Sequence, residues 1–417
     1  MTYTAEIIAV GTELLLGGTA NTDAQDVSRV LSELGINVFF HTVVGDNPER
    51  LKQAVDVAKS RANIIITTGG LGPTYDDLTK QTLAEAFGKK LILNEDVANQ
   101  IREYFAKRYP NMKMTDNNLR QAELPEGCVI LDNGVGTAPG CAFEVDGLHV
   151  LMLPGPPREC RAMLVSCVVP YLKKLSESEI HSHNIHIFGL GESMVEEKLH
   201  GLMENMQNPT LAPYAKSGEV MLRLTAKSES KAEAEKLMAP VLSKIRETLG
   251  DIIYGIDTGS LENTVAGLLT EHGLTLATAE SCTGGLLSKR LTDIPGASKF
   301  FMGGLVAYSI SSKTALLGID PALINEKGAV SREVAIAMAD GARIKLDADI
   351  GIGITGLAGP EGDGSRTEPG TVHVALTTKD KSYCRSLHFY QDRTRVRIMS
   401  ASHALDMIRR LLTGIEM

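Results

Sequence analysis

Short aliphatic and β-branched runs alternate with amphipathic stretches over roughly the first 170 positions of this chain. The runs at Glu6–Val10 and Asn63–Thr68 are largely apolar, and each is followed by glycine, which is typical of strands buried on both faces. Between them, apolar residues recur every three to four positions over Asp23–Leu34 and Pro48–Ala58, which predicts helices. This alternation predicts a mostly parallel sheet covered on both faces.

The pattern changes from about His181 to Tyr254 and then returns. The intermediate stretch combines strand-like segments with one long charged helix, which is typical of a small α+β module. A second alternating region opens near Leu261, and glycine-rich loops follow its predicted strands at Leu274–Ala277 and Asp349–Thr355. We therefore expect two three-layer α/β domains with mostly parallel or mixed sheets, at residues 1–172 and 256–417. The small module, at residues 173–255, joins them.

Composition and charge disfavour several classes of protein. The 417 residues are 43% hydrophobic and 22% charged, as in globular proteins, and a net charge of -9 disfavours duplex nucleic acid as a partner. The sequence holds no run approaching the roughly 18 apolar residues of a membrane span, and its first residues do not resemble a signal peptide. The six cysteines show no CxxC spacing, which indicates free thiols in a reducing compartment. We expect a cytoplasmic protein.

The first candidate site is the run TGGLGPTYDD at Thr68–Asp77, which follows a predicted buried strand and precedes a predicted helix at Leu78–Phe87. Glycines permit positive φ and close backbone approach, so their amides and the helix N-terminus can cradle a phosphate. The candidate phosphate-binding residues are Gly69, Gly70, Gly72 and Thr74.

Three acids should lie beside this loop. Asp77 ends the run, Asp46 follows the strand Val38–Val44, and Glu13 follows the first strand, so parallel pairing would bring all three to one sheet edge. Carboxylates beside a phosphate indicate a divalent cation between them, Mg²⁺ or Co²⁺. The alternative is that Asp77 and Asp46 cap the helices that follow them.

The fragments AVGTELLLG, NTDAQ, TVVGDN, TGGLGPTYDDLTK, NGVGTAPG and LPGPPRE cover residues 1–172. They resemble the molybdopterin-binding-type domain of the competence/damage-inducible CinA family. The resemblance implies that Asp46 and Asp77 serve a metal and the active site of an ADP-ribose pyrophosphatase. The chain departs from the commoner family pattern at Asp23, where asparagine is usual, and at Tyr75, where a charged residue is usual.

The second candidate site is AESCTGG, between a predicted strand and a predicted helix at Gly284–Thr292. Ser281 at such a turn can act as a nucleophile if a base activates it, while nearby amides stabilise an oxyanion. Lys313 is the better base, because it follows the next strand, whereas Lys289 should be solvated. The alternative is that Ser281 caps a helix and Lys313 is a surface charge. Cys282 is a stronger nucleophile, but without a His–acid partner nearby we interpret it as a buried, inert thiol.

The fragments AESCTGGLLSKRLTDIPGASKFFMGGLVAYSISSK, GAVS and ITGLAGPEGDG resemble the C-terminal CinA domain, the nicotinamide mononucleotide deamidase family. The resemblance implies hydrolysis of nicotinamide mononucleotide without a cofactor, with Ser281 as nucleophile, Lys313 as base and Tyr308 as an assisting hydroxyl. It also implies that Thr283, Gly284 and Gly285 hold substrate or oxyanion, and to this set we add Thr355 and Gly356. Either Arg393 or Arg397 can pair with the substrate phosphate; the alternative is that they face solvent. The chain departs from the family at Glu368-Pro369-Gly370 and at Gln391.

The middle module resembles the small KH-like domain of CinA proteins. Its FGLGES turn matches a nucleic-acid-clamping GxxG loop poorly, so we interpret the module as a spacer within a homodimer. His181, His183 and His186 have no Cys or Asp close by in sequence, so we interpret them as a strand face rather than a metal site. A competing hypothesis is an interaction protein of competence and DNA recombination with decayed catalytic sites.

Overall fold

The structure is a computed structural model that describes residues 3–109, 114–175, 179–204, 206–216, 218–362, 364, 367–390 and 392–417. It divides into two compact units. The first comprises Met1–His181 with Lys227–Ala234, and the second comprises Ser182–Ala226 with Glu235–Met417. Among the described residues, no helix combines the length and the hydropathy that crossing a bilayer requires.

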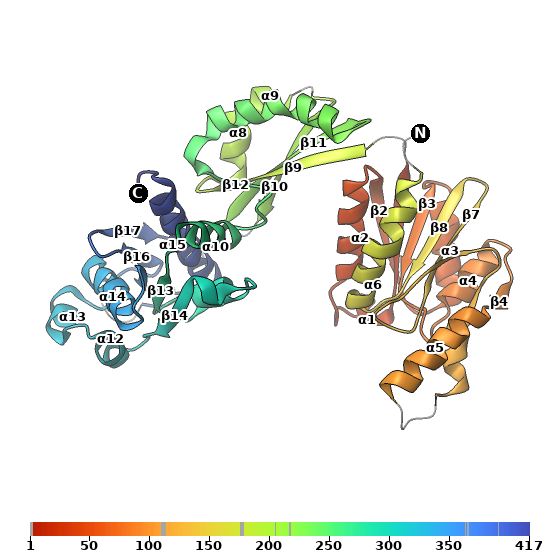
Figure 1. Cartoon of the computed structure of the whole chain (residues 1–417), viewed down its shortest axis with the longest axis horizontal. Helices are drawn as coiled ribbons and strands as arrows, with labels where there is room; N and C mark the ends of the chain where they lie inside the picture. Colours follow the sequence, from red (N-terminus) through yellow and green to blue (C-terminus); the bar gives the residue numbers. More distant parts are fainter. Residues whose placement is uncertain are drawn as a thin grey trace. The chain divides into compact units, whose positions relative to one another are not determined.

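The first unit is built on a six-stranded sheet with the order β2-β1-β3-β8-β7-β6 (Figure 1). The first four strands in this order are parallel, β7 pairs antiparallel with β8, and β6 pairs antiparallel with β7, so that only β7 runs in the opposite direction within this sheet. A separate antiparallel pair joins β4 to β5. The strands are β1 (Thr4–Val10), β2 (Asn37–Val44), β3 (Ile64–Thr68), β4 (Leu91–Leu93), β5 (Glu123–Pro125), β6 (Val129–Leu131), β7 (Gly140–Val145) and β8 (Leu148–Leu153).

Alternate residues of these strands supply two cores, one on each face of the sheet. Ile7 and Ile66 pack in the cluster that includes residues of α2 and α6, whereas Ile8 and Ile65 pack in the cluster that includes residues of α3, α4 and α5. The helices are α1 (Thr12–Leu15), α2 (Thr22–Glu33), α3 (Pro48–Lys59), α4 (Thr79–Ala86), α5 (Glu95–Arg108), η1 (Asp116–Ala122), α6 (Pro157–Met163), η2 (Leu164–Val168) and α7 (Val169–Lys173).

The small module has a four-stranded sheet with the order β10-β11-β9-β12. Its residues Phe188 and Tyr254 belong to the same buried cluster as the C-terminal domain, so the two share a core within the second unit. The elements are β9 (Glu179–Phe188), α8 (Glu192–Met203), β10 (Thr210–Lys216), β11 (Glu219–Ser228), α9 (Lys231–Leu249), η3 (Gly250–Ile252) and β12 (Ile253–Ile256).

The C-terminal domain is built on a five-stranded mixed sheet with the order β14-β13-β15-β16-β17. The first three strands are parallel, β16 pairs antiparallel with β15, and β17 pairs antiparallel with β16. The elements are α10 (Leu261–His272), β13 (Leu276–Glu280), α11 (Leu286–Thr292), η4 (Ala297–Lys299), β14 (Phe301–Val306), α12 (Ile310–Leu317), α13 (Pro321–Lys327), α14 (Arg332–Lys345), β15 (Ile350–Gly356), β16 (Thr371–Thr377), β17 (Ser382–His388) and α15 (Arg393–Thr413).

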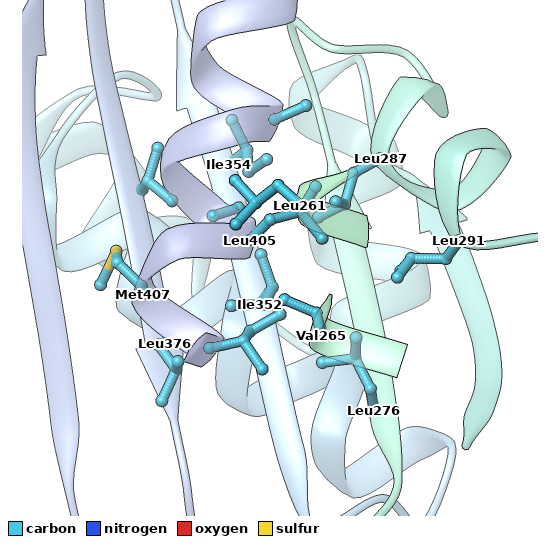
Figure 2. Packing of buried hydrophobic residues seen from close by; sticks show 14 of the residues in the cluster. Leu261, Val265, Leu276, Leu287, Leu291, Ile352, Ile354, Leu376, Leu405 and Met407 are labelled. Carbon is cyan, nitrogen blue, oxygen red and sulfur yellow. The ribbon is translucent and has the colours of Figure 1, made fainter. Parts of the chain in front are cut away.

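Helices cover both faces of this sheet. On one face α10, α11 and α15 pack through the aliphatic residues that Figure 2 displays. On the other face α14 lies directly on the backbone of β15. A Cβ at Gly351 would lie 2.1 Å from the Ala339 carbonyl oxygen, and one at Gly353 would lie 2.2 Å from that of Ala335. The predicted class of two α/β domains joined by a small α+β module is confirmed.

His183 of β9 lies between two carboxylates that the sequence analysis did not anticipate. Its Nδ1 is 2.7 Å from Asp257 Oδ2 and its Nε2 is 2.9 Å from Glu235 Oε2. Burial by itself lowers the pKa of His183, but these hydrogen bonds outweigh burial and raise it. The described residues form no group of three His, Cys, Asp or Glu side chains suited to a metal. His183 therefore links β9, α9 and the segment after β12 through hydrogen bonds to two carboxylates.

This link should make stability depend on pH. Because the pKa of His183 is raised by folding, its contribution is fully present below the unfolded value of about 6.5 and is lost as pH rises through the folded value. We expect His183→Gln to lower the urea midpoint more at pH 6 than at pH 9. The matched control is His272→Gln, at an exposed position on α10. An equal loss at both pH values would contradict the prediction.

Candidate active sites

The serine loop of the C-terminal domain lies directly after the central strand β13. This strand ends at Glu280, later than the predicted Ala277, so Ser281 is the first residue beyond it. Gly284 and Gly285 have φ values of 58° and 88°, a left-handed conformation that favours glycine. The prediction that the helix begins at Gly284 is therefore wrong, because both glycines belong to the turn and α11 begins at Leu286.

The turn is held on both sides by buried hydrogen bonds. The Ser281 N–H donates to the Ile354 carbonyl at 2.9 Å. The wholly buried Glu280 carboxylate accepts from the N–H groups of Leu287 (3.1 Å) and Ser288 (2.8 Å), and from the Ser288 hydroxyl (2.6 Å). Glu280 thus caps α11, which the sequence analysis missed; its signal is an acid between a buried strand and a glycine-rich turn.

Lys313 on α12 reaches this turn and is only 2% exposed. Its Nζ lies 2.9 Å from Ser281 Oγ, 2.9 Å from the Ala307 carbonyl oxygen and 3.1 Å from that of Tyr308. A neutral amine has two N–H donors and one lone pair, so it can donate to both carbonyls and accept the serine proton. Burial lowers the pKa of Lys313, and the Cys282 thiol opposes this only in part.

The structural alternatives for this pair are wrong. The N-cap residue of α11 is Gly285 and the carboxylate that accepts from the first turn belongs to Glu280, so Ser281 does not cap the helix; Lys313 is buried and is not a surface charge. The other candidate base, Lys289, is exposed and its Nζ lies 2.6 Å from Asp293. Burial raises the pKa of the Cys282 thiol to about 11, which makes it a poor nucleophile.

Tyr308 contacts Lys313 through its backbone carbonyl and not through its side chain. Its carbonyl accepts from Lys313, whereas its side chain is 63% exposed and lies beyond the end of β14 at Val306. The predicted strand Gly304–Tyr308 is thus shifted towards the C-terminus by two residues or more. The Tyr308 hydroxyl is not among the hydrogen-bonding partners of Lys313 in the described structure.

Thr283 carries an unsatisfied polar atom inside the turn. Its side chain is wholly buried, and among the described residues its Oγ1 has no hydrogen-bond partner. Its carbonyl accepts from Arg397 Nη2 at 2.7 Å. The Gly284 N–H donates to the Ser281 carbonyl at 3.0 Å, whereas the Gly285 N–H takes no part in these turn bonds. Gly285 is therefore the better placed of the two amides for an oxyanion.

The remaining C-terminal candidates lie at the end of β15 and in the first turns of α15. Thr355 at the end of β15 donates to the Ala329 carbonyl at 2.7 Å, and Arg393 donates to the Gly359 carbonyl at 3.1 Å. Gly356 packs tightly, because an added Cβ would lie 2.7 Å from Val372. The departure at Glu368-Pro369-Gly370 forms a turn in which Gly370 donates to Leu357 at 2.6 Å. The departure at Gln391 lies outside the described residues.

The first loop of the N-terminal unit lies at the carboxyl edge of its sheet. Gly69 and Gly70 have φ values of 96° and 67°; a Cβ at Gly69 would lie 2.2 Å from the Val10 carbonyl oxygen. Asp77 Oδ2 accepts from the Thr74 N–H at 2.9 Å and from its hydroxyl, and a Cβ at Gly72 would lie 2.4 Å from the same oxygen. The loop is thus closed on the Asp77 carboxylate.

Asp46 makes the equivalent contact on the neighbouring loop. Its Oδ2 accepts from the Thr12 N–H at 2.9 Å and the Thr12 hydroxyl at 2.8 Å. The prediction that Asp46 and Asp77 could be helix caps is wrong, because the side chain of Asn47 caps α3 and α4 has no side-chain cap. Asp46 instead joins its loop to the first residue of α1, and Asp77 closes its own loop.

Asp46, Asp77 and Glu13 follow β2, β3 and β1, which are adjacent and parallel, so they share one edge. Within the described ranges no three His, Cys, Asp or Glu side chains gather as a metal cage. The donors fit an Mg²⁺-type ion that takes one or two carboxylates and completes its coordination with phosphate oxygens.

Two features of this unit escaped the sequence analysis. Lys80 on α4 is 6% exposed, donates to the carbonyls of Arg120 and Gln121, and has a pKa lowered by burial to about 8. A cavity of about 280 Å³ lies between α5 and the β6–β7 loop. Its lining residues are Val97, Gln100, Ile101, Tyr104, Asp132, Asn133, Gly134, Gly136, Thr137 and Pro139. In the sequence, the β6–β7 loop that lines this cavity was noted only as the fragment NGVGTAPG, which supported the family resemblance.

Comparison with known families covers all three regions. Residues 6–174 match the probable molybdopterin binding domain, residues 182–255 match the damage-inducible protein CinA KH domain, and residues 258–412 match the CinA C-terminal domain. A crystal structure of the protein CinA from Thermoplasma acidophilum is 36% identical, with a TM-score of 0.37, and the match covers 40% of this chain and 95% of that chain.

Full-length relatives agree with these matches. A CinA-like protein of Kosmotoga olearia is 47% identical, over 98% of this chain and 98% of its own. A putative competence-damage inducible protein of Acetivibrio thermocellus is 46% identical, over 99% of each chain. Because nearly the whole length of the chain is shared with such relatives, it belongs to the CinA family.

Proposed function

We propose that the C-terminal domain hydrolyses the amide of nicotinamide mononucleotide, giving nicotinate mononucleotide and ammonia. The observation that carries the proposal is the buried contact of 2.9 Å between Lys313 Nζ and Ser281 Oγ. A lysine serves as a base only when it is neutral, and burial favours that form. The choice of substrate rests on the family resemblance of the serine loop.

The reaction runs through a serine ester. Lys313 takes the Ser281 proton as Oγ attacks the carboxamide carbon, and the oxyanion accepts from the free Gly285 N–H. The ammonium of Lys313 then gives its proton to the amide nitrogen, the C–N bond breaks, and ammonia leaves. Water attacks the ester while Lys313 takes one of its protons and returns a proton to Oγ, releasing the carboxylate product.

The turn also supplies contacts for the nucleotide. The orphaned Thr283 hydroxyl offers a donor and an acceptor next to the nucleophile, and Arg397 and Arg393 bring guanidinium groups to the first turns of α15. Guanidinium groups pair well with phosphate, so these arginines are assigned to the phosphate of the substrate. Thr355 and Gly356, at the end of the neighbouring strand β15, are assigned to substrate binding beside this turn.

For the N-terminal domain the corresponding proposal is a metal-dependent ADP-ribose pyrophosphatase. Its support is the loop of Gly69, Gly70 and Gly72, closed on Asp77, beside the Asp46 carboxylate. Asp46 and Asp77, with Glu13, would hold Mg²⁺ or Co²⁺, which would neutralise phosphate charge and polarise the P–O bond. The glycine amides and Thr74 would position the phosphates.

The proposed amidase mechanism predicts that replacing Ser281 or Lys313 lowers the activity. Ser281→Ala and Lys313→Met should each lower kcat/KM for ammonia release from nicotinamide mononucleotide by about 10³-fold or more, because each removes half of the proton-transfer pair. Ser311→Ala and Lys289→Met, at exposed positions of the same domain, are the matched controls. Activity should also rise with pH at an apparent pKa below the usual lysine value of about 10.4. Full activity of Ser281→Ala would refute the assignment.

The pyrophosphatase proposal is tested separately. With ADP-ribose and Mg²⁺ or Co²⁺, the full chain should release AMP and ribose 5-phosphate, and Asp77→Ala or Asp46→Ala should lower the rate at least about 10-fold. Asp56→Ala, on the exposed face of α3, is the matched control. Metal-dependent turnover that survives both substitutions would contradict the site. No turnover at either site would favour the competing hypothesis of an interaction protein.

A further inference from the structure

The cavity between α5 and the β6–β7 loop lies at the same end of the N-terminal sheet as the Asp46 and Asp77 loops. Because β6 pairs antiparallel with β7 and β7 with β8, β6 runs in the same direction as β1, β2 and β3. The loop that follows Leu131 is therefore at the carboxyl edge of the sheet, where ligands of open α/β sheets bind. Figure 1 shows α5 extending past this end of the sheet. One edge thus carries the proposed phosphate loop and a cavity.

The cavity stands away from the phosphate loop by a distance that suits the far end of a substrate. In the sheet order, β8 and β7 separate β3 from β6, which amounts to three strand spacings. At about 4.8 Å for each spacing, the ends of β3 and β6 lie roughly 14 Å apart. An extended nucleoside diphosphate is of comparable length, so one molecule can place its phosphates in the Gly69–Thr74 loop and its nucleoside in the cavity.

The segment η1 connects these two places. Arg120 Nη1 donates to the Thr74 carbonyl in the phosphate loop at 3.2 Å. Lys80 holds the carbonyls of Arg120 and Gln121 from below, at 3.1 Å and 2.8 Å. On its other side η1 packs against α5, the helix that supplies one wall of the cavity. The phosphate loop and the cavity wall are therefore braced by one segment, which fixes the distance between them.

The lining of the cavity fits a nucleoside and does not fit a phosphate. From α5 come Val97, Ile101 and the half-buried Tyr104, an apolar surface with one aromatic ring on which a base can stack. From the β6–β7 loop comes the half-buried Thr137. Among the described lining residues Asp132 carries the only charge, and it is negative. A carboxylate repels phosphate but accepts hydrogen bonds from ribose hydroxyls.

The size of the cavity suits part of a ligand. Its volume of about 280 Å³ lies just below the roughly 300–1,000 Å³ of complete small-molecule sites. A base with its ribose fits such a volume, whereas a whole dinucleotide does not. The remainder of the ligand must then lie outside the cavity, along the carboxyl edge that carries the phosphate loop.

We propose that this cavity binds the nucleoside half of the substrate of the N-terminal domain. The base stacks on Tyr104, the ribose hydroxyls face Asp132, and the phosphates occupy the Gly69–Thr74 loop. The inference rests on the proposed pyrophosphatase function and deepens it, because it assigns the selection of nucleoside-containing diphosphates to one wall of the site. A phosphosugar without a base would be held by the phosphate loop alone.

The test compares binding of AMP and of ribose 5-phosphate to the full chain with Mg²⁺, by calorimetry. Tyr104→Ala should weaken AMP binding roughly 5-fold or more, because stacking of one base contributes about 1–3 kcal/mol. Gly134→Phe should weaken it at least as much, since a Cβ at Gly134 would meet no described atom within 4 Å and a side chain there fills the cavity. Neither change should alter binding of ribose 5-phosphate.

Two matched controls separate filling of the cavity from general damage. Tyr109→Ala, at the exposed C-terminal end of α5, and Gly201→Phe, at an exposed position of α8 with open space around it, should leave AMP binding unchanged. Hydrogen exchange locates the site. AMP should slow exchange of the amides of residues 97–104 and 132–137 in the unsubstituted chain but not in Gly134→Phe. For ADP-ribose turnover, Tyr104→Ala should raise KM and leave kcat within about 2-fold, because a remote contact acts on binding.

The outcomes for the cavity and for the proposed reaction are distinguishable. The cavity proposal is overturned if the unsubstituted chain does not bind AMP, or if Tyr104→Ala and Gly134→Phe both bind AMP as it does. It is also overturned if either variant loses ribose 5-phosphate as strongly as AMP, because the change would then act on the phosphate loop. If ADP-ribose is not hydrolysed but AMP binding shifts as expected, the pyrophosphatase proposal fails and the nucleoside site stands.

Discussion

The chemistry that we propose for the C-terminal domain depends on one constraint, the burial of the Lys313 amine against a serine hydroxyl and two backbone carbonyls. An isolated ammonium is costly to bury, so the cheapest buried state is a neutral amine whose hydrogens are satisfied by carbonyl oxygens. In the proposed reaction the remaining lone pair then takes the proton of the Ser281 hydroxyl. This proposed base is prepared by desolvation, without a second charged residue in contact with Nζ among its described partners.

The surrounding elements fix the position of the turn that carries Ser281. Glu280 ends β13 and caps α11, so the turn between them has fixed ends. Arg397 of α15 holds the same turn through the Thr283 carbonyl, and the apolar face of α15 packs with α10 and α11 in the core (Figure 2). The serine loop therefore rests on elements from three parts of the chain.

The glycine-rich loop at Thr68–Asp77 of the N-terminal unit also follows a buried strand, but it presents different chemical groups. Its glycines allow the backbone to approach β1 closely, and the loop closes on a carboxylate rather than on an amine. Asp46 and Asp77 each accept hydrogen bonds from a threonine through Oδ2, which orients the carboxylates without cancelling their charge. Such acids suit a cation shared with phosphate, whereas the serine loop presents neutral groups that suit an amide.

The sequence by itself determined the alternation of strands and helices, both glycine-rich loops and the nature of the candidates, because periodicity, glycine and residue chemistry are local properties. It placed Ser281 at a strand end and preferred Lys313 to Lys289, since parallel neighbours meet at one edge. Only the tertiary structure decided that α11 begins at Leu286, that Glu280 caps it, that Tyr308 contributes a carbonyl, and that His183 meets Asp257 and Glu235. The His183 contacts join segments far apart in the sequence, and the others depend on burial and on the conformation of short turns, which periodicity does not encode.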